Sequence, residues 1–179
     1  MIVLVGFMGA GKTTVGRRLA ARLGLPFADS DLVIEQRAGR SVRQIFADDG
    51  EAAFRALEQQ VIAELAAGPD MVLALGGGAV EHDGTRKLLR SATVVYLRVS
   101  YEEVQRRVGG DPRRPLLRRP DVADLYRERR AAYESAATLT VTAEGRPPAA
   151  VCEEVTKALA RLRHGPPRRI VSLERDSAQ

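Results

Sequence analysis

Apolar segments of two kinds alternate along the chain. Short runs rich in branched apolar residues, such as residues 2–5 and 93–99, are typical of strands that are buried on both faces of a sheet. Between these runs, apolar positions recur every three or four residues, which is the spacing of an amphipathic helix. The pattern predicts strands at residues 2–5, 27–28, 71–75, 93–99 and 138–142. It predicts helices at residues 12–23, 32–37, 41–50, 51–67, 83–90, 101–108, 121–137 and 148–163.

This alternation of strand and helix predicts an α/β fold, in which helices cover both faces of a parallel sheet. We expect one domain over residues 1–163, because the chain shows no internal repeat and no linker. Residues 109–120 lack apolar periodicity and hold three prolines and four arginines, which indicates a mobile loop. The basic segment 164–179 is expected to be a flexible tail.

The composition narrows the choice of partners and compartment. The 179 residues carry a formal net charge of +5, which is a reason to consider nucleic acid as a partner. However, the basic residues are spread along the chain, and no Trp and only four Phe and four Tyr are present for base stacking. One cysteine, Cys152, excludes an internal disulfide, and no apolar stretch approaches the length of a membrane span. No signal peptide fits, so we expect a cytoplasmic monomer without nucleic-acid or membrane partners.

The most specific motif is the segment Gly6–Thr13, which fits G-x-x-x-x-G-K-[ST] between a predicted strand and a predicted helix. Its glycines let the backbone curl so that N–H groups point at a phosphate, and the N-terminus of the next helix faces the same anion. Lys12 can reach the β- and γ-phosphates, and the Thr13 hydroxyl can bind Mg²⁺. The motif predicts binding of Mg·ATP through Gly6, Gly9, Ala10, Gly11, Lys12, Thr13 and Thr14.

Two carboxylates, Asp29 and Asp31, follow the second predicted strand, at the edge where parallel sheets bind ligands. One carboxylate could bind the metal, directly or through water, and the other could accept or orient the proton of a substrate hydroxyl. The alternative is a purely structural role, in which Ser30 or Asp31 caps a helix that begins near Leu32.

Three consecutive glycines, residues 76–78, follow the third predicted strand. Hydrolytic P-loop proteins generally carry a metal-binding Asp at the end of such a strand. Glycine at all three positions indicates that the backbone itself approaches a ligand. The alternative is a tight turn from strand to helix, for which one glycine would suffice.

Several arginines have open interpretations from the residues alone. Arg113 and Arg114 lie in the loop at 109–120, where they could close over the phosphates or remain solvated. Arg55 and Arg129 stand on predicted helices, where a surface position is the more common outcome.

Together these segments resemble the shikimate kinase family over roughly residues 1–163. The resemblance rests on their order and spacing, since each segment alone is weak evidence. The segments that carry it are Gly6–Thr13, Asp29-Ser30-Asp31, Gly39-Arg40-Ser41 before Ile45-Phe46, Phe54-Arg55 with Glu58, Gly76–Val80, Arg114–Leu117, and Arg129 four residues before Tyr133.

The resemblance implies a nucleoside-monophosphate-kinase fold with a five-stranded parallel sheet, substrate-binding helices at about residues 32–61 and a lid at about residues 109–120. The implied reaction is phosphorylation of the 3-hydroxyl of shikimate by Mg·ATP, in the biosynthesis of chorismate and the aromatic amino acids. The competing hypotheses are a P-loop kinase of gluconate or of nucleotides, and a nucleotide-dependent switch.

The resemblance also implies roles for single residues. Asp31 would be the base at the substrate hydroxyl, and Arg55 and Arg129 would bind the substrate carboxylate, with Arg130 as an alternative to Arg129. Glu58, one helical turn after Arg55, could hold that guanidinium in place. Catalysis would rest on Lys12, Asp31 and Arg114. The other implied sites are the substrate cleft at Gly76, Gly77 and Gly78, the metal ligands Thr13 and Asp29, and Arg107, Arg114, Arg146 and Pro147 beside ATP.

Overall fold

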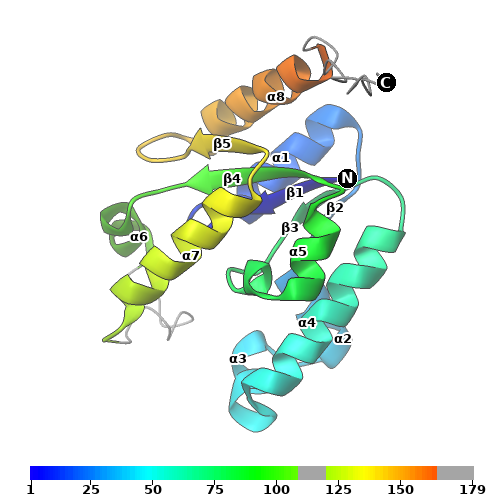
Figure 1. The fold of residues 1–179 in the computed structure, drawn as a ribbon, viewed down its shortest axis with the longest axis vertical. Coiled ribbons are helices and arrows are strands. Elements are labelled where there is room, and N and C mark those ends of the chain that lie inside the picture. The colour runs from blue at the N-terminus through cyan, green and yellow to red at the C-terminus, as the bar shows by residue number, and fades with distance from the viewer. Residues whose placement is uncertain (109–119, 165–179) are drawn as a thin grey trace, which may run out of the picture.

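The computed structural model describes residues 1–108 and 120–164 (Figure 1). The strands are β1 (Ile2–Val5), β2 (Phe27–Asp29), β3 (Val72–Ala74), β4 (Thr93–Arg98) and β5 (Leu139–Thr142). The helices are α1 (Lys12–Leu23), α2 (Ser30–Ala38), α3 (Val42–Asp48), α4 (Gly50–Ala67), η1 (Ala79–Glu81), α5 (Asp83–Leu89), α6 (Tyr101–Val108), α7 (Val122–Ala136) and α8 (Pro148–His164). The loop predicted at 109–120 lies outside the described residues apart from Pro120, and so does the tail from residue 165 onward.

The strands form one parallel five-stranded sheet in the order β2-β3-β1-β4-β5, which confirms the predicted fold. Strand β1 lies at its centre, where Ile2 pairs with Val72 on one side and with Thr93 on the other. The chain moves from β1 to β2 in one direction and from β3 to β4 in the other. Because crossovers between parallel strands are right-handed, α1 and α5 lie on opposite faces. Helix α8 packs beside α1, and α7 lies on the face of α5 (Figure 1).

Two separate apolar clusters hold these layers together. The larger one surrounds the sheet and includes the fully buried Val3 and Leu4 of β1. The smaller one lies among α2, α3 and α4, at the far end of the molecule from α8 (Figure 1). Its buried members are Ile34, Ile45, Phe54 and Val61. The helices beside β2 therefore have a core of their own.

Local capping fixes the ends of three helices. Ser41 and Gln44 form a capping box at the start of α3, in which each side chain bonds the backbone of the other residue. Gly24 and Gly39 end α1 and α2 in the left-handed conformation, with φ of 65° and 63°. The sequence pattern missed one element, the short helix η1 between the three glycines and α5.

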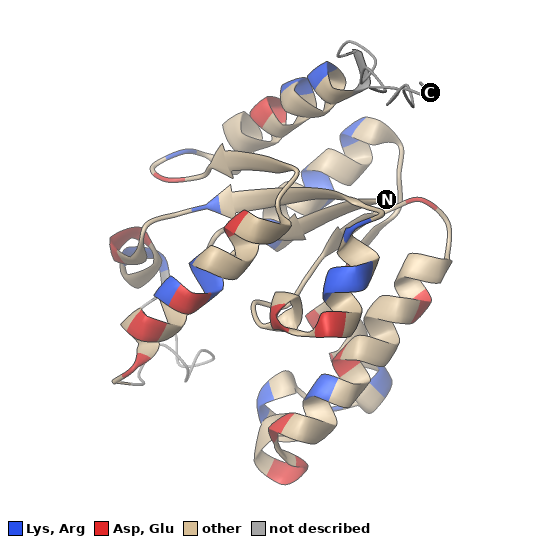
Figure 2. Ribbon diagram, in the orientation of Figure 1, with Lys and Arg blue, Asp and Glu red and all other residues tan. Residues whose placement is uncertain are grey.

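None of the helices within residues 1–108 and 120–164 combines the length and apolar character that a membrane crossing requires. In Figure 2, acidic and basic positions are interspersed on α4, α6 and α7, whereas α1 carries four basic residues and no acidic one. The basic residues of α1 are Lys12, Arg17, Arg18 and Arg22, so this helix is the one with a marked excess of positive charge in Figure 2.

Gly16 marks a close approach between α1 and β2. A Cβ atom at this position would lie 2.4 Å from a ring carbon of Phe27 and 3.0 Å from a methyl carbon of the buried Leu4. We predict that Gly16→Ala lowers the free energy of unfolding by about 1–3 kcal/mol, because overpacking outweighs the better helix propensity of alanine. Urea denaturation measures this change.

Gly84→Ala in α5 is the matched control, since the nearest atom to its added Cβ would lie 3.9 Å away. This variant should be neutral or slightly stabilising, as expected for an open helical position. Equal effects of the two substitutions would contradict the close approach at Gly16.

Candidate active site

The loop between β1 and α1 has the conformation that a phosphate cradle requires. Gly6, Gly9 and Gly11 have φ of 148°, 81° and 92°, which side chains rarely tolerate. At Gly6 a Cβ atom would also lie only 2.7 Å from the carbonyl oxygen of Leu97. Gly11 is the N-cap of α1, so the positive end of that helix meets the loop. Lys12 donates to the Gly6 carbonyl over 2.7 Å, which folds its ammonium group across the loop.

Asp29 joins this loop to the second strand. Its Oδ2 accepts a hydrogen bond of 2.6 Å from the Thr13 hydroxyl, and its Oδ1 accepts the backbone N–H groups of Asp31 and Leu32. Asp29 is therefore the N-cap of α2, which begins at Ser30. The alternative in which Ser30 or Asp31 caps a helix beginning near Leu32 is wrong.

The Thr13 and Asp29 oxygens form a donor set that suits Mg²⁺, a hard cation with few protein ligands and several waters or phosphate oxygens. Within the described ranges, no three His, Cys, Asp or Glu side chains come together as a metal cage. The Thr13 hydroxyl and the Asp29 carboxylate, beside a phosphate loop, are the kind of ligands that suit a magnesium ion bound to a nucleotide.

Because Asp29 provides the cap, the Asp31 carboxylate has no capping role. Its Oδ1 is buried and has no hydrogen-bond partner among the described residues. Burial raises the pKa of Asp31 to about 6, the charges of Asp29 and Glu58 act in the same direction, and Lys12 opposes them. A buried, unpartnered carboxylate oxygen is typical of a group that meets a ligand.

The three glycines after β3 provide the surface on which several charged side chains meet. A Cβ atom at Gly76 would lie 2.4 Å from Asp31 Oδ1, and one at Gly78 would lie 2.4 Å from Arg55 Nη2. A Cβ atom at Gly77 would lie 3.4 Å from Arg129 Nη1. A tight turn alone does not require these three positions to be glycine, because the close contacts come from side chains of other elements.

Two hydrogen bonds fix the backbone of the glycine segment. The N–H of Gly76 donates to the buried Ser30 hydroxyl over 2.9 Å. The Tyr133 hydroxyl donates to the carbonyl of Gly77 over 2.5 Å. Both partners lie next to predicted site residues, since Ser30 precedes Asp31 and Tyr133 is one helical turn after Arg129. From the sequence, Ser30 is a candidate only for capping a helix and not for holding the glycine segment.

Arg55 on α4 is held by two glutamates of the same helix. Its Nη1 donates to Glu58 over 2.7 Å, and Nε and Nη2 face Glu51 at 3.4 and 3.2 Å. The guanidinium also lies over the ring of Phe54, with its carbon 5.3 Å from the ring centroid. Glu58 is completely buried, and its second oxygen has no hydrogen-bond partner within the described residues. Glu58 therefore orients Arg55, as its helical spacing predicts.

The structure distinguishes the two neighbouring arginines of α7. Arg129 is buried, lies beside Gly77, and makes an ion pair of 3.3 Å with Glu81. Arg130 is exposed and pairs with Glu134, one turn further along the same helix. Arg129 is thus the residue that α7 brings to the glycine segment.

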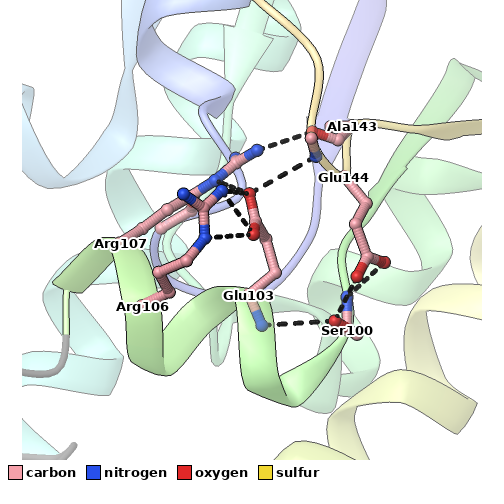
Figure 3. A network of polar contacts seen from close by, with 8 residues as sticks. Ser100, Glu103, Arg106, Arg107, Ala143 and Glu144 are labelled. Carbon is pink, nitrogen blue, oxygen red and sulfur yellow. Dashed lines mark hydrogen bonds and ion pairs between the residues drawn. The ribbon is translucent and has the colours of Figure 1, made fainter.

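Arg107 on α6 bonds the phosphate loop, its own helix and the segment that follows β5 (Figure 3). Its Nη1 donates to the Gly9 carbonyl over 3.2 Å, and its Nη2 donates to the Ala143 carbonyl over 2.6 Å. Its Nε donates to Glu103, one turn earlier on α6. The guanidinium therefore sets the spacing between the phosphate loop and the segment that follows β5.

Arg146 and Pro147 lie at the end of that segment. Arg146 donates to the carbonyls of Thr142 and Ala150 over 3.2 and 3.4 Å and pairs with Glu154. The carbonyl of Pro147 accepts the N–H of Ala150 as α8 begins. The two residues predicted beside adenine thus shape the turn into α8.

Comparison with known proteins identifies the family. The family model for shikimate kinase matches residues 8–160. Shikimate kinase of Thermobifida fusca (strain YX) is 49% identical over 162 residues, which are 89% of this chain and 94% of that protein. The chain belongs to the shikimate kinase family.

Solved structures of shikimate kinases agree with this membership. The crystal structure of shikimate kinase from Aquifex aeolicus matches with a TM-score of 0.83 and 35% identity, and the match covers 92% of this chain and 99% of that one. Shikimate kinase from Acinetobacter baumannii, in complex with shikimate, matches with a TM-score of 0.80 and 38% identity over 91% of this chain and 92% of that one.

Most of the shikimate kinase residues predicted from the sequence lie in two neighbouring groups. The first surrounds the phosphate loop, and the second surrounds the glycine segment. Arg113 and Arg114 lie outside the described residues, as does nearly all of the predicted lid, so their roles stay predictions.

Glu103 is a further residue that the sequence analysis did not single out. Its carboxylate is 6% exposed and accepts hydrogen bonds from Arg106, Arg107 and the N–H of Gly145. The bonds from Arg106 and Arg107 lower the pKa of Glu103. Its spacing of three and four residues from these arginines is a signal that the sequence does contain.

We predict that Glu103→Ala lowers the melting temperature by at least about 3 °C, because Arg107 and the N–H of Gly145 lose their shared acceptor. Thermal unfolding followed by circular dichroism measures this shift. Glu102→Ala is the matched control, since Glu102 is an exposed acidic residue in the same first turn of α6. Equal shifts in the two variants would contradict a central role of Glu103 in this network.

Proposed function

We propose that this chain transfers the γ-phosphoryl group of ATP to the 3-hydroxyl of shikimate, giving shikimate 3-phosphate and ADP in the biosynthesis of chorismate and the aromatic amino acids. The observation that carries the proposal is the meeting of Asp31, Arg55 and Arg129 on the glycine segment. Membership of the shikimate kinase family supports it, as does the complex of the related Acinetobacter baumannii enzyme with shikimate.

The acceptor side of the site needs side chains that bind the carboxylate of shikimate and a side chain that meets its reacting hydroxyl. Arg55 and Arg129 would bind the carboxylate of the acid, because planar guanidinium groups match a fixed carboxylate well. Asp31 would meet the reacting hydroxyl with its buried, unpartnered oxygen. The backbone of Gly76, Gly77 and Gly78 would line the cleft, since no side chain separates it from these groups.

The reaction is an in-line displacement on the γ-phosphorus. The 3-hydroxyl oxygen forms the new bond to phosphorus, the bond to the oxygen bridging the β- and γ-phosphates breaks, and the hydroxyl proton passes to the Asp31 carboxylate. Catalysis rests mainly on positioning and on neutralising the phosphate charge, in which Lys12 and Arg114 take part.

The donor side is built on the phosphate loop. The loop backbone and Lys12 would bind the triphosphate, and Thr13 and Asp29 would hold Mg²⁺, which supplies charge neutralisation when bound. Arg107, with Arg146 and Pro147, would border the adenine. The full set proposed for ATP is Gly6, Gly9, Ala10, Gly11, Lys12, Thr13, Thr14, Arg107, Arg114, Arg146 and Pro147.

The organisation around this site is part of the same proposal. Residues 1–163 would form the kinase domain, with acceptor helices at about 32–61, a lid at about 109–120 and a basic tail at 164–179. The small apolar core among α2, α3 and α4 supports a distinct acceptor region. The enzyme would act as a cytoplasmic monomer without nucleic-acid partners, because few aromatic side chains are present for base stacking.

A panel of acceptors with Mg·ATP tests this function. The panel contains shikimate, gluconate and nucleoside monophosphates, and coupled detection of ADP measures turnover. We expect turnover with shikimate alone. Arg55 and Arg129 suit an acid better than a nucleotide, and membership of the shikimate kinase family favours shikimate over gluconate, which is also an acid. Turnover of gluconate or a nucleotide instead of shikimate would reject the assignment. ATP binding without transfer to any acceptor would favour a nucleotide-dependent switch.

We predict that Asp31→Asn lowers kcat by at least about 10²-fold, because the amide cannot accept the hydroxyl proton. The Kd for ATP, measured by calorimetry, should stay within about twofold, since Asp31 faces the glycine segment. Asp83→Asn, an exposed substitution on α5, is the control and should behave as wild type. Wild-type turnover of Asp31→Asn would remove Asp31 from the catalytic role.

A further inference from the structure

Glu81 is the partner of a buried charge in the proposed acceptor site. Its two carboxylate oxygens face Nε and Nη2 of Arg129, at 3.4 and 3.3 Å. The Arg129 side chain is 7% exposed, whereas that of Glu81 is 38% exposed. A buried guanidinium needs a counter-charge, and among the described residues Glu81 is the acceptor of both hydrogen bonds that Arg129 makes.

The contact with Glu81 occupies one edge of the Arg129 guanidinium and leaves its other edge available for a second partner. A guanidinium has two edges with paired donors, one formed by Nε and Nη2 and the other by Nη1 and Nη2. Glu81 takes the first edge of Arg129. Nη1 lies toward the glycine segment, 3.4 Å from where a Cβ of Gly77 would be. The second edge is therefore the one turned to the proposed substrate cleft.

The position of Glu81 is coupled to that of the glycines. Glu81 is the last residue of η1, which begins directly after Gly78. The N–H groups of Ala79 and Glu81 donate to the carbonyls of Gly76 and Gly78, over 3.2 and 3.0 Å. The turn that presents the glycine backbone therefore also places the carboxylate against Arg129.

Arg55, beside Gly78, is also held by carboxylates of this chain. Glu51 faces its Nε and Nη2, while Nη2 lies 2.4 Å from where a Cβ of Gly78 would be. Arg55 differs from Arg129 in that its Nη1 also has a partner, Glu58, at 2.7 Å. The pairing of Arg55 arises within one helix, whereas that of Arg129 depends on η1.

We propose that Glu81 is a positioning residue, which holds the Arg129 guanidinium so that its free edge meets the substrate carboxylate. This inference rests on the proposed function. A fixed planar fork binds a carboxylate with less loss of side-chain freedom than a mobile one. Glu81 acts through Arg129 and does not touch the substrate.

Substitution of Glu81 tests this role through a split between KM and kcat. We expect Glu81→Ala to raise the KM for shikimate about tenfold, with the KM for ATP and kcat within about twofold of wild type. Glu81→Gln keeps one acceptor oxygen and should give a smaller increase. Glu134→Ala is the control, since it removes an acidic partner of the exposed Arg130 on the same helix, and it should leave all three constants unchanged. Thermal unfolding verifies that each variant is folded.

A double-mutant cycle shows whether the effect passes through Arg129. In an Arg129→Ala background, adding Glu81→Ala should not raise the KM for shikimate further. An unchanged or lowered KM in Glu81→Ala, or an equal increase in both backgrounds, would overturn the inference while the proposed function stands. Absence of shikimate turnover in the wild-type enzyme would instead reject the proposed function, and this inference with it.

Discussion

The proposed acceptor half of the site depends on the lack of side chains at the end of β3. At Gly76 and Gly78 even one added carbon would collide with Asp31 or Arg55. Because the backbone is bare there, charged side chains from α2, α4 and α7 reach the same short segment. Arg55 pairs with Glu58 and Arg129 pairs with Glu81 because charges brought together away from water need counter-charges.

The proposed donor half depends on a different use of glycine. In the phosphate loop, positive φ values allow the turn between the central strand and α1. The two halves meet because the carboxyl ends of parallel strands point to the same edge of a sheet, and β3 is the direct neighbour of β1. Asp29 ends β2, on the other side of β3, and Asp31 lies two residues further along the chain. The bond from Thr13 to Asp29 joins both halves.

The sequence predicts the sheet and the long helices well, because burial on both faces of the strands and on one face of the helices leaves regular apolar patterns. The family resemblance adds the candidate site residues, whose roles stay predictions. The features that the sequence did not predict depend on contacts between helices and strands. Capping by Asp29 follows from where α2 begins, and the choice of Arg129 over Arg130 follows from which side of α7 meets the glycines. The short helix η1 has too few residues for any apolar period to indicate it.

The separate core of the acceptor helices has an evolutionary consequence. Ile34, Ile45, Phe54 and Val61 pack with one another, apart from the cluster that supports the central sheet. Arg55 lies against the Phe54 ring, so one of the proposed carboxylate ligands rests on this small core. Substitutions within it can reshape the pocket for the phosphate acceptor without repacking β1 or the ATP loop. A lineage can therefore acquire a new acceptor while inheriting its phosphate donor unchanged.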